Sequence, residues 1–176
     1  DIPRIARECV REIGYTGHSH GFDADDCAVL TSINEQSPDI ARGVDKALEN
    51  RLNETSDTLS TGAGDQGMMF GYANSDTPEL MPMPVSLAHD LCRQLTAVRK
   101  AGEERLLPDG KSQVTVAYVD DKPVHIDTVV ISTQHTEDIS QEELTELVKE
   151  KVIKQVLPAN LFDESTRILV NPTGRF

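Results

Sequence analysis

Three glycines, an acid and an amide occupy one short segment of this 176-residue chain, Gly62-Ala63-Gly64-Asp65-Gln66-Gly67. Glycine lets a backbone approach a ligand closely, and it adopts positive φ angles that other residues avoid. The segment therefore predicts a polar loop that presents the Asp65 carboxylate and the Gln66 amide to a ligand. An apolar run at residues 68–73 follows directly and is expected to form a strand.

Two other interpretations of the glycine segment compete with this one. Its spacing also satisfies the dinucleotide-binding fingerprint, but that fingerprint requires a strand before it and a helix after it. Here a polar stretch, residues 53–58, precedes the glycines, and the apolar run follows them. A plain glycine turn is the second alternative. The acid and amide inside the segment, together with the motifs described next, favour a ligand site.

Other polar motifs stand where elements are expected to begin or end. Pro38 restricts the residue before it to extended geometry, which can hold the Gln36 amide at the base of a loop. An amide offers both donors and an acceptor and suits an amino-acid ligand, although an Asx-type turn is the alternative. Pro-Asp-Gly-Lys ends at Lys111, a cation that could contact phosphate, while Asp109 could accept from ribose hydroxyls. A surface turn is the alternative for this motif.

The last motif, Asn171-Pro-Thr-Gly-Arg-Phe176, offers Arg175 as a bidentate donor to phosphate and Phe176 as a ring that could stack on a base. A capped strand end is its structural alternative. His135 closes Ser-Thr-Gln-His and is best interpreted as a hydrogen-bonded strand-end residue rather than a base or a ligand. His18 and His20 lie among aspartates but lack the spacing of a zinc site, and we predict no metal ligand on the chain.

Composition narrows the classes of function. The net charge of −13 argues against nucleic-acid and anionic-membrane partners, although a few local cations can still form a nucleotide pocket. Three cysteines without C-x-x-C spacing are expected to be reduced core thiols of a cytoplasmic protein. No apolar stretch approaches the ~20 residues that span a bilayer. The chain lacks an initiator Met, starts at a helix cap and ends just after a strand, so we expect an internal piece of a longer protein.

Hydrophobic periodicity predicts the elements that position these motifs. Apolar residues recur at helical spacing in three segments and alternate, or form short runs, in five others. The expected helices cover 1–13, 85–100 and 140–157, the last opened by a capping box at Ser140 and Glu143. The expected strands cover 27–32, 68–73, 113–119, 124–133 and 167–171, with a turn at 120–122. Residues 34–61 show no periodicity beyond a short helical piece near 44–52.

The order from residue 67 onward is β-α-β-β-α-β, which predicts an α+β fold of two layers with the helices on one face of the sheet. Residues 1–41 would be the end of a similar N-terminal unit. Residues 42–61 are predicted to be a flexible gating loop, with a disordered linker as the alternative. Residues 62–176 would form the central domain.

Five motifs of this chain match one protein family, and they occur in the same order as in that family. They are Gln-Ser-Pro-Asp-Ile (36–40), Gly-Ala-Gly-Asp-Gln-Gly (62–67), Pro-Asp-Gly-Lys (108–111), Ser-Thr-Gln-His (132–135) and Asn-Pro-Thr-Gly-Arg-Phe (171–176). The chain resembles the S-adenosylmethionine synthetases, or methionine adenosyltransferases. The resemblance covers essentially the whole chain, with residues 41–61 the least similar part.

The resemblance implies a transferase of one-carbon metabolism. The methionine sulfur attacks the ribose 5′ carbon of ATP and displaces triphosphate, which is then cleaved to phosphate and pyrophosphate. It further implies Mg²⁺ and K⁺, three related βαββαβ units, and active sites shared in a homodimer that commonly pairs into a homotetramer.

By the same resemblance, Gln36 would contact methionine and Asp65 would reach the substrate site. Asp109 and Lys111 would bind the ribose and phosphate of ATP, and Arg175 and Phe176 would hold the adenosine end. The family's His-Pro-Asp and lysine-rich segments are not in these 176 residues. We therefore expect the metal ligands to lie mostly outside the chain and the chain alone to be inactive. A non-catalytic regulatory homologue that binds nucleotide and methionine is the alternative function.

Overall fold

The computed structural model describes residues 1–17, 21–53 and 60–176. The chain falls into two compact units, one made of residues 1–6 and 28–71 and the other of residues 7–27 and 72–176. The second unit contains the sheet and most of the buried core, and the two units are described separately below.

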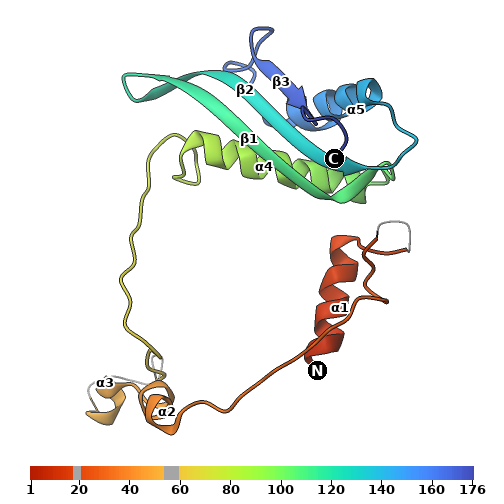
Figure 1. Ribbon diagram of the computed structural model, residues 1–176. Coiled ribbons are helices and arrows are strands. Elements are labelled where there is room, and N and C mark those ends of the chain that lie inside the picture. Colours follow the sequence, from red (N-terminus) through yellow and green to blue (C-terminus); the bar gives the residue numbers. More distant parts are fainter. Residues whose placement is uncertain (18–20, 54–59) are drawn as a thin grey trace. The chain divides into compact units, whose positions relative to one another are not determined.

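The second unit is built on a three-stranded sheet in the order β1-β2-β3 among the described residues. Strands β1 (Leu106–Val119) and β2 (Lys122–His135) form a long antiparallel hairpin (Figure 1). Strand β3 (Arg167–Val170) pairs parallel to β2, so β2 is the central strand. The predicted strands at 113–119, 124–133 and 167–171 are confirmed, and the hairpin strands are longer than predicted.

The hairpin turn follows from two aspartates. Asp120 and Asp121 have φ angles of 49° and 58°, and the flanking residues Val119 and Lys122 are paired. Two successive left-handed residues are the requirement of a type I′ turn, which matches the twist of the strands. Asp tolerates this region better than most residues, so the sequence places the turn correctly.

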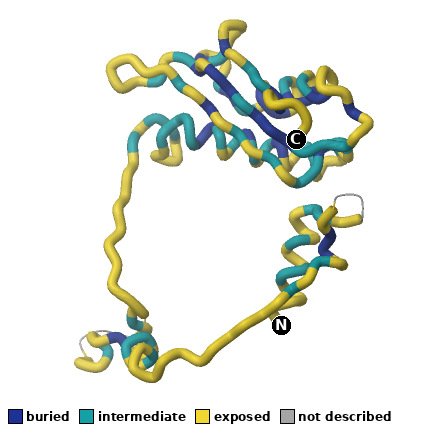
Figure 2. Tube along the Cα trace, viewed as in Figure 1, coloured by how far each residue is buried: buried dark blue, intermediate teal, exposed yellow. Residues whose placement is uncertain are grey.

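One face of the sheet packs against helices. Helix α4 (Met83–Lys100) packs along β1, and the helical segment formed by α5 (Gln141–Val148), η3 (Lys149–Ile153) and α6 (Lys154–Val156) contacts α4. The buried side chains of both helical segments join strand residues of all three strands in a single core, drawn in dark blue in Figure 2. The predicted arrangement of helices on one face is therefore observed in this unit.

The helical segments match their predicted inner faces. Leu87, Leu91 and Leu95 of α4 are buried, as periodicity predicts. The α5 helix begins with the predicted capping box, in which the Glu143 N–H donates to Ser140 Oγ at 3.2 Å and the Ser140 N–H donates to Glu143 Oε2 at 3.0 Å. The wider π-helical turn η3, which the sequence did not predict, buries two consecutive residues, Val152 and Ile153.

Helix α1 (Ile2–Ile13) forms where periodicity predicts it, yet none of its residues, all described, is buried. Helices α2 (Pro38–Asp45) and α3 (Leu48–Arg51) occupy part of the segment that was expected to be irregular. The three cysteines are free thiols, but Cys9 is exposed and the others are half-buried, so the prediction of core thiols is wrong. Within the described residues, no helix is long and apolar enough to cross a bilayer.

Two predicted strands, 27–32 and 68–73, do not form among the described residues. Leu30 is 95% exposed and Phe70 is 88% exposed, and Figure 2 draws most of the 27–32 segment and the 68–73 segment in the yellow of exposed residues. Apolar runs have strand propensity, but a strand needs a ladder partner for its backbone groups. The described sheet offers neither segment such a partner, so the predicted β-α-β-β-α-β unit appears here as α-β-β-α-β.

A carboxylate with little solvent exposure joins α4 to η3. Glu103 lies in the turn after α4, and its side chain is 9% exposed. It accepts from Arg105 Nε at 2.7 Å and from Lys151 Nζ at 2.8 Å. These two hydrogen bonds lower the pKa of Glu103 from 4.5 to about 2, with the Arg105 bond the largest cause. Gln94 of α4 adds a bond to the Lys151 carbonyl at 2.9 Å.

We predict that Glu103→Gln makes stability less dependent on pH. A carboxylate whose pKa is lowered by folding stabilises the fold above its ordinary pKa, and that contribution is lost as pH falls from about 5 toward 2. Because both cations are about half exposed, the substitution should lower the free energy of unfolding by about 1–2 kcal/mol at pH 7.

Urea unfolding at pH 7 and pH 3 measures this difference, which should shrink at pH 3. The matched control is Glu146→Gln, because Glu146 pairs with Lys149 on the surface and its side chain is 66% exposed. A Glu103→Gln protein as stable as the control at pH 7 would contradict the prediction.

Candidate functional site

A cavity of about 600 Å³ lies where the ends of two strands meet in the second unit. Its wall combines the start of β1, the end of β2 with the loop after it, and the segment after β3. The residues that line it are Leu107, Gln134, His135, Thr136, Glu137, Arg175 and Phe176. A volume of this size suits a ligand as large as a nucleoside.

Two of the predicted nucleotide-binding residues line this cavity, and a third contacts one of them. Phe176 and Arg175 form part of its wall. Lys111 Nζ lies 5.0 Å from the centroid of the Phe176 ring, which is within the range of a cation–π contact. The structure thus brings together groups from two motifs that are about 65 residues apart in the sequence.

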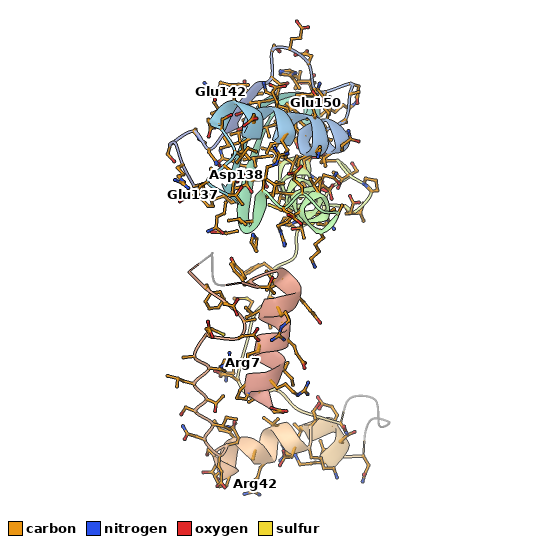
Figure 3. The ribbon with its side chains drawn as sticks, turned by 90° about the vertical axis from the view of Figure 1, so that its right-hand side faces the viewer. Arg7, Arg42, Glu137, Asp138, Glu142 and Glu150 are labelled. Atoms are coloured by element: carbon orange, nitrogen blue, oxygen red, sulfur yellow. The ribbon has the colours of Figure 1, made fainter. Side chains whose placement is uncertain are left out.

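The Arg175 guanidinium forms an ion pair with Glu137 at 3.0 Å. Figure 3 shows Glu137 beside Asp138 on the loop that joins β2 to α5. Both partners are well exposed, at 60% and 89% of their side-chain surfaces, so this pair adds little to stability. An anionic ligand could therefore replace Glu137 as the partner of Arg175 at low cost. The sequence did not predict Glu137 at the site, although it lies two residues after Ser-Thr-Gln-His.

Three polar side-chain atoms of the cavity residues are shielded from solvent and have no hydrogen-bond partner within the described part of the chain. They are Gln134 Oε1, His135 Nε2 and the Thr136 hydroxyl oxygen, which can donate as well as accept. His135 Nδ1 lies 2.8 Å from the Thr136 carbonyl, which can only accept, so Nδ1 carries the proton and Nε2 is left as an acceptor. The prediction that His135 is a hydrogen-bonded strand-end residue is confirmed. Its unpaired nitrogen additionally suits a ligand with N–H or O–H donors.

Asp109 lies on the same strand as Lys111 but in an irregular part of it. The β1–β2 register shifts between Leu106 and Gly110, and Asp109 is exposed within that interval. Beyond it, Lys111 pairs with Ser132, whose strand continues to Gln134 and His135 at the cavity. The irregularity lets a turn-forming Pro-Asp-Gly sequence sit inside an extended strand.

In the first unit, the glycine segment is held by backbone contacts rather than by a sheet. The Gly62 N–H donates to the Val44 carbonyl at 2.8 Å, and the Ala47 N–H donates to the Ser60 carbonyl at 2.8 Å. A Cβ atom at Gly62 would lie 2.0 Å from the Gly43 carbonyl oxygen. Gly62 is therefore required for the close approach of two backbones, which closes the base of the predicted gating loop.

The predicted methionine-binding residues also belong to the first unit. Asp65 is exposed, and its Oδ1 accepts from the Gln66 N–H at 2.7 Å. Gln36 is exposed just before α2, and Ser37 has the extended geometry (φ −51°, ψ 129°) that Pro38 was expected to impose. The six predicted site residues therefore divide between the units, with Gln36 and Asp65 in one and the four nucleotide-binding candidates in the other.

The described residues do not form a metal site of His, Cys, Asp and Glu. No three such side chains among them lie close enough to hold an ion. The histidine pair at 18 and 20, for which a zinc site was considered, lies outside the described residues.

Comparison with known proteins assigns the chain to a family. Residues 60–176 match the family model for the central domain of S-adenosylmethionine synthetase. The chain belongs to the S-adenosylmethionine synthetase family. Two relatives are named S-adenosylmethionine synthase, one from Clostridium acetobutylicum, 57% identical over 177 residues, and one from Clostridium botulinum, 55% identical over 177 residues. Both alignments cover 100% of this chain and 45% of the relative.

The chain thus spans about 45% of the length of these S-adenosylmethionine synthases. The family model includes the cavity and the glycine segment, while Gln36 and α2 precede it. The resemblance inferred from the five motifs is therefore confirmed at the level of the family.

We predict that Gly62→Ala in the full-length protein loosens the base of the 42–61 loop. The new methyl group would overlap the Gly43 carbonyl oxygen, a backbone atom, so the two segments must separate. Hydrogen exchange at the amides of Gly62 and Ala47 should become about tenfold faster or more, which corresponds to a decrease of about 1.4 kcal/mol in the free energy of local opening. Limited proteolysis within the loop should accelerate as well.

The matched control is Gly43→Ala on the other side of the same contact. A Cβ at Gly43 meets nothing within 4 Å, so this variant should keep the exchange rates of the parent protein. Equal acceleration in both variants would show that the contact between Gly62 and Gly43 does not close the loop.

Proposed function

We propose that the full-length protein carrying this sequence is a methionine adenosyltransferase. It would form S-adenosylmethionine from ATP and L-methionine with release of phosphate and pyrophosphate. The chain described here would hold ATP in the cavity between the ends of β1 and β2 and the segment after β3. The observation that carries the proposal is that Arg175 and Phe176 line that cavity while Lys111 lies over the Phe176 ring.

Each of these groups has a function that suits one part of ATP. Phe176 offers an aromatic face for the adenine ring, and Arg175 offers a planar set of donors for an anionic or carbonyl acceptor. Lys111 is a point charge suited to phosphate. Because Lys111 lies over one face of the Phe176 ring, adenine would stack on the opposite face or displace the lysine. Asp109, close to Lys111 in sequence, would accept from the ribose hydroxyls.

The unpaired acceptors of the cavity favour a ligand with hydrogen-bond donors. Gln134 Oε1 and His135 Nε2 would each remain unsatisfied beside a purely anionic ligand. An exocyclic amino group or a ribose hydroxyl supplies the missing donor, and a buried acceptor without a partner costs about 1–3 kcal/mol. This complementarity supports a nucleoside rather than inorganic phosphate alone.

The proposed chemistry requires positioning more than proton transfer. A thioether sulfur has no proton to lose when it attacks the 5′ carbon, so no general base is needed for that step. The protein must align sulfur and carbon and stabilise the departing polyphosphate. Asp65 would lie near the sulfur and favour the sulfonium charge, and Gln36 would bind the amino-acid part of methionine. Mg²⁺ and K⁺ belong to this proposal with their ligands mostly outside the chain, in a cytoplasmic enzyme.

We also propose a homodimer with shared active sites, which pairs further into a homotetramer. The face of the sheet opposite the helices is the surface that supports this. The register places Lys111, Val130 and Leu169 away from the α4 side, and the last two are half-buried without a covering helix. A second copy of the same sheet would cover this face and bring its own Asp65-bearing loop to the shared site.

The first test is turnover. The full-length protein should convert methionine and ATP to S-adenosylmethionine in a radiolabelled-methionine assay, and the 176-residue chain alone should not. Turnover by the isolated chain would refute the assignment of essential groups to other segments. Binding of ATP and methionine by the full-length protein without turnover would instead support the regulatory homologue.

Substituting Lys111→Met in the full-length protein should weaken the use of ATP. Methionine keeps the length of the side chain but removes the charge that would face phosphate. We expect the KM for ATP to rise about 10- to 100-fold, which corresponds to the loss of one charge-assisted contact. Steady-state kinetics with ATP varied measures this, and Lys122→Met, next to the hairpin turn at the opposite end of β1 and β2, is the control. Unchanged KM and kcat would contradict the role of Lys111.

Replacing Asp65 with Asn should lower kcat strongly while leaving the fold intact. The Asn side-chain oxygen can still accept from the Gln66 N–H, so the substitution removes the charge alone. We expect a decrease in kcat of about 10²- to 10³-fold, the range found when one electrostatic group is removed from a transition state. Asp45→Asn, an exposed carboxylate at the end of α2, should leave kcat unchanged. Steady-state kinetics of both variants, measured side by side, test this prediction.

A further inference from the structure

Asn171, the residue directly after β3, uses its side chain as a strand partner for β2. It is 3% exposed. The Thr133 N–H donates to Asn171 Oδ1 at 2.9 Å, and Asn171 Nδ2 donates to the Thr133 carbonyl at 3.2 Å. The last residue pair of the parallel ladder is Ile131 and Val170, and the Asn171 N–H then donates to the Ile131 carbonyl at 2.9 Å. The Asn171 amide satisfies both backbone groups of Thr133 just beyond this backbone bond.

Few residue types meet the requirements of this position. Asn171 has a φ angle of 44°, in the left-handed region that Asn enters at lower cost than most residues. Its amide must also donate and accept at once, and a carboxylate cannot donate to the Thr133 carbonyl. A hydroxyl or a longer amide differs in reach. Asn is therefore dictated by both the backbone and the hydrogen bonds.

The same residue begins the turn that leads to the cavity. The Gly174 N–H donates to the Asn171 carbonyl at 2.9 Å, which closes a four-residue turn, and Gly174 has a φ angle of 104°. The next two residues, Arg175 and Phe176, line the cavity. On the other side of the amide bridge, Thr133 directly precedes Gln134 and His135 of the opposite wall. The amide bridge between Asn171 and Thr133 thus joins the two walls, and the residues that line the cavity follow these two residues by one to five positions in the sequence.

We propose that Asn171 is a positioning residue for ATP, which sets the distance between the Arg175–Phe176 wall and the Gln134–His135 wall. The inference deepens the proposed function and rests on it. Without the amide, the nearest link between β2 and the turn would be the backbone bond from the Asn171 N–H to the Ile131 carbonyl, and the two walls beyond it could separate. Because a displacement of about 1 Å can cost about 100-fold in a catalysed reaction, a small separation would matter for ATP.

The test uses Asn171→Gly in the full-length enzyme. Glycine accepts the positive φ angle without strain, so the variant removes the amide and little else. The Kd for ATP by calorimetry and the KM for ATP should both rise about tenfold or more. The KM for methionine should change less than about twofold, because Gln36 and Asp65 belong to the other unit. A purely structural role would lower the thermal midpoint without separating the two substrates.

Thr166 provides the matched control at the opposite end of β3. It is 8% exposed, and its Oγ1 donates to the Ile126 carbonyl of β2 at 2.8 Å. Thr166→Val removes a buried side-chain bond between the same two strands while leaving the cavity end untouched. It should lower the thermal midpoint yet keep the ATP parameters within about twofold. Asn171→Asp keeps the acceptor for the Thr133 N–H, so its Kd and KM for ATP should lie between those of Asn171→Gly and those of the parent enzyme. It serves as the test if the glycine variant does not fold.

Three results would overturn the positioning role. The first is a Kd and a KM for ATP of the Asn171 variants within about twofold of the parent values. The second is an equal increase in the KM for ATP and the KM for methionine, and the third is an equal effect of Thr166→Val on the ATP values. A parent enzyme that neither binds nor turns over ATP would overturn the proposed function as well. A parent enzyme that binds ATP as tightly as Asn171→Gly would overturn the positioning role alone.

Discussion

The candidate site depends on how β3 is held against the central strand β2. Four residue pairs make up this parallel ladder in the described chain, from Thr128–Arg167 to Ile131–Val170. Parallel pairing is slightly weaker than antiparallel pairing for each residue. Buried side chains reinforce it at both ends, Thr166 at the start and Asn171 at the finish. Since one wall of the cavity continues β2 and the other follows β3, this short ladder sets the shape of the site.

The charge close to the cavity differs in sign from the net charge of the chain. The chain carries a net charge of −13, yet Arg175 lines the cavity and Lys111 contacts its lining residue Phe176. The acidic lining residue, Glu137, is an exposed side chain paired with Arg175. At physiological ionic strength, exposed charges beyond about 8 Å are largely screened. A polyanion such as a nucleoside triphosphate would therefore respond to the two cations rather than to the distant carboxylates. This is why an acidic chain is compatible with the proposed function.

The sequence predicted best what is decided by neighbouring residues. The capping box of Ser140 and Glu143 and the turn at Asp120 and Asp121 form as expected, because the groups that interact lie within three residues of one another. The inner faces of α4 and α5 follow from helical periodicity. The two apolar runs at 27–32 and 68–73 were interpreted as strands, and both remain unpaired in the described residues. Strand propensity is local, but a strand forms only where another segment supplies its hydrogen bonds.

The sequence by itself determined the family, through five motifs in order, and the residue types suited to ATP and methionine. Only the tertiary structure decided which of them share a site. It placed Lys111 over Phe176, made Glu137 the partner of Arg175, and assigned to Asn171 a structural bridge in a motif for which a capped strand end had been the alternative. The physical reason is distance along the chain. Asn171 and Thr133 are 38 residues apart, and only the pairing of β3 with β2 brings the amide to the backbone that it completes.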